Sequence, residues 1–268
     1  MFRNYLIIAG ISLLLPSVVG AQDVAGKPSN SKQSDWDISL GLGAGVKPTF
    51  EGSDRYSVQA MPLVNVVYKD MISLGINGLN AYWRNGPLRI GAGLTYNSGR
   101  PDSKENGVLG SQGDDRLRGM GGIDTALGLK AFASYRLGIV DVSASVTKYT
   151  GGNNNGVVSD VGIAMPYRLT NELTVTPHTG LTWGNRDYMQ TFFGVTSAQS
   201  ANSGFAKYSV GAGIKDIKAG IDANYRLDKN WFLNLRTDVK QLVGKAADSP
   251  ISFSDTGVTA MVAIGYRF

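Results

Sequence analysis

The sequence predicts an all-β fold, a closed antiparallel transmembrane β-barrel with short turns at one end and long loops at the other. Apolar residues alternate with small or polar ones over stretches of about ten residues, the length that a tilted strand needs to cross a bilayer. Short connections also alternate with long polar ones along most of the chain. No long apolar run follows Ala21, so the sequence predicts no spanning helix in the mature chain.

The last strand, residues 258–268, shows the alternation most clearly. A half-buried strand of a soluble sandwich would explain this segment taken alone, but would not explain the alternation of short and long connections. We expect Tyr266 and Phe268 to lie in the aromatic girdle and to form the membrane-insertion signal, because a closing aromatic strand resembles that of bacterial outer-membrane barrels. The apolar face consists of Val258, Ala260, Val262, Ile264, Tyr266 and Phe268.

The amino-terminal region predicts export. Arg3, the apolar run 6–15 and the small residues Val19, Gly20 and Ala21 are typical of a signal peptide that is cleaved after Ala21. Residues 22–35 are polar and aperiodic, which predicts a flexible periplasmic tail. The sequence therefore divides into a signal peptide (1–21), this tail (22–35) and a barrel (36–268).

The number of strands depends on residues 71–83. That stretch is too long for a turn, and a single extra strand would place the loop 98–122 on the wrong side of the membrane. A short hairpin there gives twelve strands, and without it the number is ten. The other predicted strands are 36–46, 57–68, 87–97, 123–136, 139–149, 159–169, 173–183, 217–227, 231–242 and 257–268.

Two irregularities stand out within these strands. Pro62 cannot donate to a strand ladder, which predicts a bulge at this position. The apolar phase changes from even to odd positions near residues 214–217, which predicts a second bulge.

Composition excludes several classes of site. The chain has no cysteine, so it forms no disulfide or thiolate metal site. Its net charge of +5 is scattered and not gathered in a stripe, so nucleic acid is not an expected partner. We expect contacts with outer-membrane lipid and lipopolysaccharide, while plain solubility explains the excess charge equally well.

Charged residues on the faces opposite the lipid predict a wet or ion-paired interior. Pairing across the lumen would hold the barrel's shape, whereas unpaired charges would suit a polar solute. His178, the only histidine, has no serine placed beside it by the pattern, so we predict no enzyme activity and no cofactor. The acidic loop pairs Asp114/Asp115 and Glu51/Asp54 are interpreted as solvated surface charge or weak cation-binding groups. The predicted lumen-facing charged residues are Arg89, Asp124, Lys130, Arg136, Asp141, Asp160, Arg168, His178, Asp222, Arg226, Arg236, Asp238 and Lys240.

Five segments together resemble one family. They are residues 50–56 (FEGSDRY), 99–102 (GRPD), 192–195 (FFGV), 249–251 (SPI) and 265–268 (GYRF). In order and spacing they resemble the MltA-interacting protein/OmpV family of outer-membrane proteins. The motif residues carried by the loops are Glu51, Gly52, Ser53, Asp54, Arg100, Ser249 and Pro250.

The resemblance implies a location in the outer membrane of a Gram-negative bacterium. It also implies a non-enzymatic scaffold that links a lytic transglycosylase to a penicillin-binding protein in murein remodelling. Two alternatives remain open, a small-solute channel and a surface adhesin that acts through the long loops.

Overall fold

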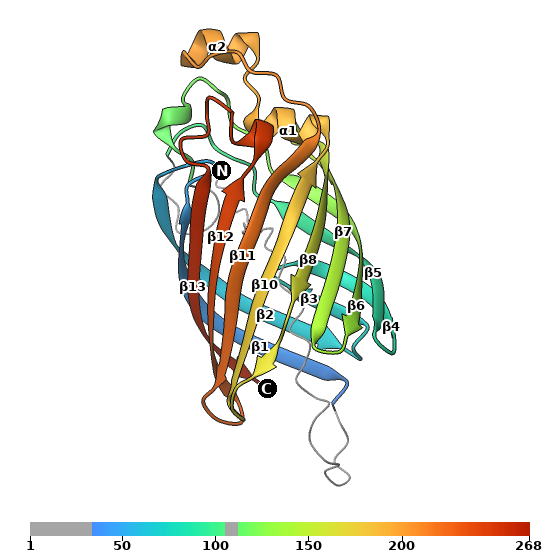
Figure 1. Cartoon of the computed structure of the whole chain (residues 1–268). Coiled ribbons are helices and arrows are strands. Elements are labelled where there is room, and N and C mark those ends of the chain that lie inside the picture. Colours follow the sequence, from blue (N-terminus) through green and yellow to red (C-terminus); the bar gives the residue numbers. More distant parts are fainter. Residues whose placement is uncertain (1–33, 105–111) are drawn as a thin grey trace, which may run out of the picture.

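The computed structural model describes residues 34–104 and 112–268, and these form one closed sheet (Figure 1). Neighbouring strands pair antiparallel around the ring, and β13 (Thr256–Arg267) returns to pair with β1 (Trp36–Pro48). The predicted signal peptide and all but the end of the predicted tail lie outside the described residues. No helix in the described ranges is long and apolar enough to cross a membrane.

Long connections gather at one end of the barrel, here called the loop end, and short turns gather at the other, the turn end (Figure 1). The loop end carries α1 (Arg186–Phe193), α2 (Ser197–Ser203) and the 3-10 helices Asp115–Leu117 and Gly244–Ala246. Between β1 and β13 the strands are β2 (Tyr56–Tyr68), β3 (Ile72–Gly75), β4 (Gly78–Asn85), β5 (Leu88–Asn97), β6 (Ala126–Leu137), β7 (Val140–Thr150), β8 (Gly156–Ala164), β9 (Tyr167–Arg168), β10 (Leu173–Gly184), β11 (Gly213–Arg226) and β12 (Trp231–Leu242).

The prediction of twelve crossings is confirmed in the described residues. β8 and β9 both pair with β10 and make one crossing, interrupted at Met165 and Pro166. Proline has no N–H to donate, which accounts for a break in the ladder there. Residues 72–85 form the expected hairpin, β3 and β4.

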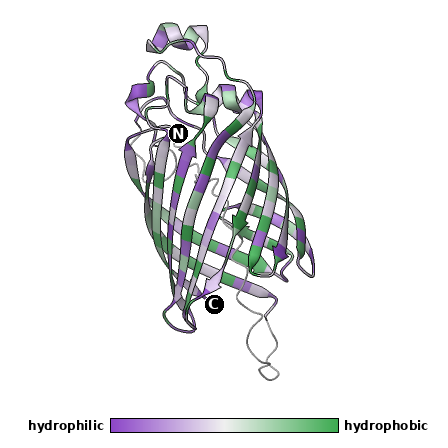
Figure 2. Ribbon diagram, in the orientation of Figure 1, coloured by the Kyte–Doolittle hydropathy of each residue, from purple (hydrophilic) through white to green (hydrophobic). Residues whose placement is uncertain are grey.

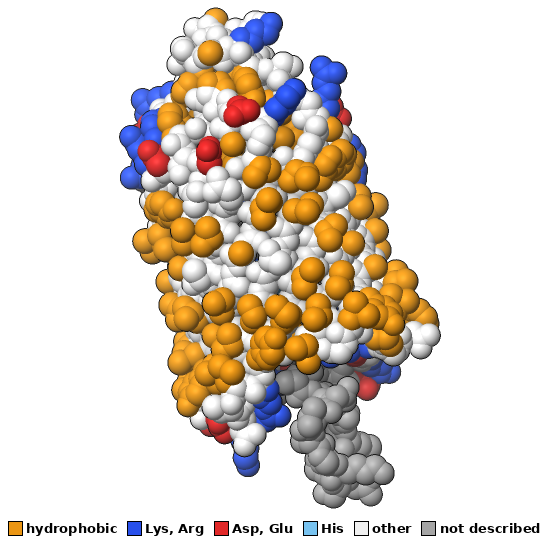
Figure 3. Space-filling model, in the orientation of Figure 1, with side chains coloured by type: hydrophobic (Ala, Val, Ile, Leu, Met, Phe, Trp, Pro, Cys, Tyr) orange, Lys and Arg blue, Asp and Glu red, His pale blue; other side chains and the backbone are white. Residues whose placement is uncertain are grey.

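The outer surface of the wall is apolar. Leu42, Val58, Leu129, Leu235 and Val262 are exposed although they lie in the middle of strands. On the face shown in Figure 3, apolar side chains cover the wall and charged side chains gather toward its two ends, and Figure 2 shows hydrophobic residues along the strands. Such a band requires a lipid surrounding, because an exposed apolar surface of this extent is unfavourable in water.

An aromatic girdle marks the turn end. Trp231 packs edge-on against Tyr266 with ring centres 5.1 Å apart, and Tyr266 packs on Phe268 at 4.9 Å. Trp36 and Tyr68 lie 4.5 Å apart on the neighbouring pair of strands. Rings of this kind prefer the membrane interface, so the girdle locates one boundary of the membrane.

The hairpin β3–β4 is about half as tall as the wall, which leaves one edge of β2 open. β3 pairs only with Val66–Tyr68, so residues 56–65 of β2 have no strand on that side among the described residues. The backbone hydrogen bonds run from Lys69 N to Asp35 O and from Thr49 N to Arg55 O. The backbone N–H and C=O groups of odd residues of β2 therefore point toward β1, and those of even residues point toward the open edge.

The predicted bulge at Pro62 is wrong. Pro62 pairs with Leu42 in an unbroken register, and as an even residue it lies on the open edge, where no N–H is needed. The bulge near 214–217 is confirmed: Asp216 pairs with Thr182 and Ile214 with Trp183, so Lys215 is the extra residue.

Candidate functional site: the loop-end cap and the barrel interior

The loops fold into a packed structure across the loop end, here called the loop-end cap (residues 49–55, 98–104, 112–125, 185–212 and 243–255). Its apolar residues are buried, unlike those of the wall, which face outward. One cluster surrounds Phe193 and Met189, and another surrounds Leu117 and Ile251. All four side chains are almost fully buried, so the cap has a core of its own.

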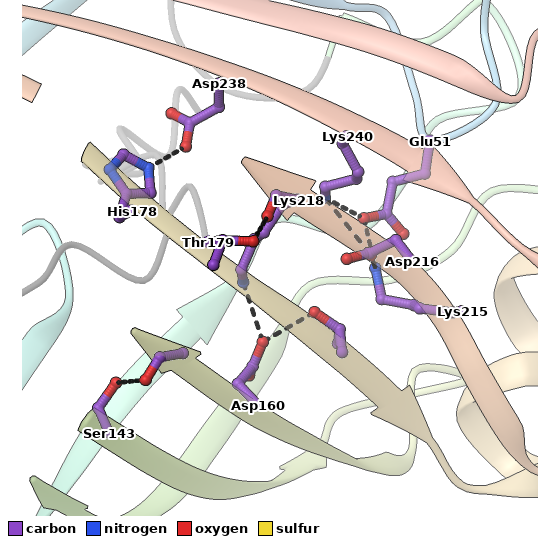
Figure 4. Close-up of polar contacts among 12 residues, drawn as sticks. Glu51, Ser143, Asp160, His178, Thr179, Lys215, Asp216, Lys218, Asp238 and Lys240 are labelled. Atoms are coloured by element: carbon purple, nitrogen blue, oxygen red, sulfur yellow. Dashed lines mark hydrogen bonds and ion pairs between the residues drawn. The ribbon is translucent and has the colours of Figure 1, made fainter. Parts of the chain in front are cut away.

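Glu51 fastens the first loop of the cap to the barrel wall (Figure 4). Its Oε1 accepts from Lys215 Nζ at 2.7 Å and from Lys240 Nζ at 2.8 Å. Lys215 also donates to Asp216 Oδ2 at 2.7 Å, and the side chain of Asp216 is fully buried. Burial alone would raise the pKa of Glu51, but the two ammonium groups outweigh it and hold that pKa well below its usual range.

The backbone conformation at residue 52 requires a glycine. Its φ of +94° is unfavourable for other residues, and a Cβ there would lie 2.8 Å from Ser252 Oγ. Its carbonyl accepts from the N–H groups of Phe253 at 2.6 Å and Ser254 at 3.0 Å. The first loop is thereby joined to the last.

Ser53 and Asp54 meet the loop that follows β5. Arg116 Nη2 donates to Ser53 Oγ at 3.1 Å, and Arg116 Nη1 lies 2.6 Å from Asp54 Oδ1. Asp114 accepts from the same arginine at 3.1 Å and from Arg55 at 3.1 Å. Burial opposes ionisation of Asp114, but the hydrogen bonds from Arg116 and Thr49 lower its pKa.

Arg100 and Ser249 both hold the carboxyl end of α1. Arg100 Nη1 donates to Phe192 O at 2.8 Å, and Ser249 Oγ donates to Phe193 O at 2.6 Å. These carbonyls end the helix and need partners from outside it. Burial lowers the pKa of Arg100 to about 10. Pro250 lies half-buried between Ser249 and the buried Ile251.

The seven motif residues therefore lie in one structure, although they come from three loops that are far apart in the sequence. Their contacts hold the first, second and fourth long loops to one another and to α1. What the contacts do is structural: they close and stiffen the loop end.

In the interior, His178 forms a buried cluster with Asp238 and Arg236 (Figure 4 shows the first two). His178 Nε2 lies 2.7 Å from Asp238 Oδ1 and 3.1 Å from Arg236 Nη2. Arg236 Nε also donates to Asp238 Oδ2 at 2.7 Å. Asp222 accepts from Asn234 on the next strand at 3.2 Å. The imidazole is engaged by charged neighbours, which favours a structural role; that the chain is no enzyme stays a prediction.

Other predicted interior charges are also paired. Lys218 Nζ lies 3.2 Å from Asp160 Oδ1, and Arg136 Nε lies 2.8 Å from Asp141 Oδ1 near the turn end. Lys240 belongs to the cluster around Glu51. Arg89 and Lys130 form no ion pair within the described ranges. In those ranges no group of three or more histidine, aspartate or glutamate residues is arranged to hold a metal ion.

Three predicted lumen-facing residues lie elsewhere. Asp124 is exposed in the cap, because β6 begins only at Ala126. The backbone N–H of Asp124 donates to Asn153 Oδ1 at 2.8 Å. Arg168 and Arg226 are exposed at the turn end, where both donate to the carbonyl of Asn171. The alternating pattern continues past the ends of the strands, and so it assigned an interior face to residues beyond the wall.

Sequence reasoning missed Lys215, Asp216, Asp114 and Arg116. Lys215 and Asp216 are adjacent charges at the change of phase, and that coincidence was the available signal. The interpretation of Asp114 as solvated surface charge is wrong, since its side chain is 2% exposed, whereas that of Asp115 is 49% exposed. Nothing in a local pattern distinguishes these two neighbours. The same interpretation is also wrong for Glu51, whose carboxylate is bound by Lys215 and Lys240.

Comparison with known proteins gives one family. The family described as MltA-interacting protein MipA matches residues 40–268. The MltA-interacting protein of Escherichia coli (strain K12) is 30% identical over 119 residues, which are 43% of this chain and 46% of that protein. The Shigella flexneri protein gives the same values. The chain therefore spans about half the length of the curated relatives it matches.

Solved structures give distant likenesses. The KdgM porin has a TM-score of 0.41 at 10% identity, covering 86% of this chain and 99% of that chain. The anion-selective porin from Comamonas acidovorans has a TM-score of 0.40 at 8% identity, covering 87% and 98%. These likenesses are too distant to bear on function.

Proposed function

Because the chain belongs to the MltA-interacting protein MipA family, we propose that it is an outer-membrane scaffold for enzymes that remodel murein. Its barrel is of the outer-membrane kind, which supports an outer-membrane location. The family match over residues 40–268 is the observation that carries the proposal. The name of these relatives, MltA-interacting protein, points to the lytic transglycosylase MltA as the class of partner. A penicillin-binding protein would be a second partner of the same scaffold.

The arrangement of the two ends supports a partner on the periplasmic side. Short turns of outer-membrane barrels face the periplasm and long loops face outward. The outward end is spanned by the packed cap, so we do not propose the small-solute channel. No contact among the described residues favours the adhesin hypothesis over the scaffold hypothesis.

The turn end offers a surface with charges of both signs. A hollow of about 530 Å³ lies between the turns after β9 and β11, lined by Glu172, Arg226, Leu227, Asp228 and Lys229. Elsewhere on this end, Lys69 pairs with Asp35 and Arg84 with Asp70. The hollow is where a globular partner can contact several polar groups and one leucine together, so we propose it as part of the binding surface.

Photo-crosslinking in living cells tests the proposal. A photoreactive residue at Leu227 should capture a lytic transglycosylase, whereas one at the exposed Val58 on the membrane face should not. Substituting Arg226 and Lys229 with alanine should weaken the capture, while Lys69→Ala, a cation of the same end outside the hollow, should not. Capture of no murein enzyme at any turn-end position would refute the scaffold.

We also propose that residues 1–21 are removed on export and that the tail from Gln22 adds to the periplasmic surface. Amino-terminal sequencing of protein purified from outer membranes should begin at Gln22. Deletion of residues 22–34 should leave the barrel assembled and reduce capture of the partner.

A further inference from the structure

The inner face of β4, β5 and β6 carries two cations that have no carboxylate partner among the described residues. Arg89 and Lys130 lie here, and neither forms an ion pair with any residue of 34–104 or 112–268. Arg84 and the hydroxyl of Tyr82 already engage Asp70, and Lys218 and Thr182 engage Asp160. Within the described ranges, neither Arg89 nor Lys130 is therefore in contact with a carboxylate.

Strand register arranges this wall in three tiers. Asn80, Gly93 and Lys130 lie side by side in the first, Tyr82, Gly91 and Phe132 in the second, and Arg84, Arg89 and Ser134 in the third. A Cβ on Gly91 would lie 2.6 Å from Phe132 Cζ and 2.7 Å from Tyr82 Cβ. The two aromatic side chains thus cover the glycine and form a floor.

The cations lie around this floor. The Arg89 guanidinium carbon is 3.6 Å from the centre of the Tyr82 ring and 5.5 Å from that of Phe132. Lys130 Nζ is 5.4 Å from the centre of Phe132, and it donates to Asn77 O at 3.2 Å, which leaves it two further N–H groups. Stacking on Tyr82 fixes the plane of the guanidinium.

Two buried polar atoms on the wall lack partners in the part of the chain that the structure describes. Arg89 Nε and Asn80 Oδ1 are both buried and form no hydrogen bond with those residues. The Asn80 side chain lies directly over Gly93, in the tier of Lys130, and the residue is only 7% exposed. Asn80 Nδ2 donates to Gly78 O at 3.2 Å, so the amide is held in this orientation. An unsatisfied buried donor such as Arg89 Nε is unfavourable, so a bound group that accepts hydrogen bonds would stabilise this wall.

We propose that this wall binds a small organic carboxylate. The carboxylate accepts from Arg89 and Lys130, and its organic body packs on the partly exposed ring of Phe132, since the Arg89 guanidinium covers Tyr82. Arg89 is the second residue of β5, close to the turn end, so the ligand arrives from the periplasmic mouth. The proposal is independent of the scaffold function, since it involves the interior and no protein partner.

Equilibrium dialysis of labelled benzoate against the refolded barrel tests the site. Benzoate joins a carboxylate to a ring, and benzyl alcohol is its neutral counterpart. We expect wild type to bind benzoate in the range of about 1 mM or tighter and to bind benzyl alcohol much more weakly. Arg89→Gln with Lys130→Gln should weaken benzoate binding about tenfold or more, since hydrogen bonds from both cations are lost.

Two further variants make the result decisive. Asn80→Asp keeps the size of the side chain and adds a negative charge beside Lys130, so it should abolish binding. Arg136→Gln with Asp141→Asn removes a paired lumen couple and should leave binding within about twofold. Heat-modifiable gel mobility confirms that each variant is folded. Absence of benzoate binding, equal binding of benzyl alcohol, or unchanged binding in the Arg89 and Lys130 variant would each overturn the proposal.

Discussion

Replacing Glu51 with glutamine should loosen the loop-end cap while leaving the barrel wall intact. The substitution keeps the shape of the side chain and removes the charge that two ammonium groups share at 2.7 and 2.8 Å. Removing one partner of a buried ion pair costs about 3–5 kcal/mol when the other charge is left alone. Here Lys215 keeps Asp216, and the Lys240 side chain is 32% exposed and can turn toward water.

The cost of Glu51→Gln is therefore closer to that of losing one charge-assisted hydrogen bond than to that of leaving a buried charge alone. We expect a loss of about 2 kcal/mol in the free energy of opening of the cap, which is roughly a thirtyfold faster amide hydrogen exchange in residues 49–55 and 185–212. Exchange in the middle of β12 and β13 should not change, because those ladders do not depend on the cap.

Two controls fix the interpretation. Asp54→Asn removes a carboxylate whose side chain is 54% exposed. It should change the free energy of opening of the cap by less than about 1 kcal/mol. Glu51→Gln with Lys240→Gln restores the balance of charge and should recover part of the loss. Exchange in Glu51→Gln equal to that of wild type would refute the idea that this cluster holds the cap.

Three other outcomes are expected. Val142→Arg should lower the free energy of unfolding by about 2–4 kcal/mol if it lies at the bilayer midplane. Ser143→Arg, one residue along on the inner face, should lower it much less. Folding titrations into lipid vesicles measure both, and equal losses would contradict the assigned faces. Deletion of Phe268, whose ring packs on Tyr266, should lower the amount of folded protein in outer membranes on heat-modifiable gels, and normal levels would contradict its role in insertion. The depressed pKa values of Glu51 and Asp114 stabilise the cap above the unfolded-state pKa of about 4, and this contribution is lost as pH falls through the lower folded-state values. Exchange in the cap, corrected for its intrinsic pH dependence, should hence be constant down to about pH 5 and rise below about pH 4; a rise already near neutral pH would contradict this.

The wall could be predicted from the sequence because alternation is a local property. Each strand shows its lipid face at every second residue, and the parity of crossings supplied the hairpin at residues 72–85. The bulge at Lys215 was likewise visible as a change of phase. These features depend on neighbours a few residues apart.

The cap could not be predicted in the same way. Glu51 meets Lys215 and Lys240, which lie 164 and 189 residues further along the chain, and no periodicity relates loops to one another. Resemblance to a family did single out Glu51, Arg100 and Ser249, but it gave no partners for them. The open edge of β2 was missed because a strand's own sequence does not say how tall its neighbour is.

Because the hairpin β3–β4 is about half as tall as the wall, the ring contains β3 and β4 at the turn end and lacks them at the loop end. Around the turn end every crossing has a paired neighbour on both sides, with one interruption at Met165 and Pro166, so any widening must stretch the ladders of the ring together. Above Ile76 and Asn77 that edge of β2 pairs with no strand among the described residues, and the cap residue Gln112 contacts it instead, its side-chain amide donating to Val58 O at 3.4 Å. The wall thus keeps its girth by strand pairing at the turn end, whereas beside β2 it depends on the packed cap at the loop end.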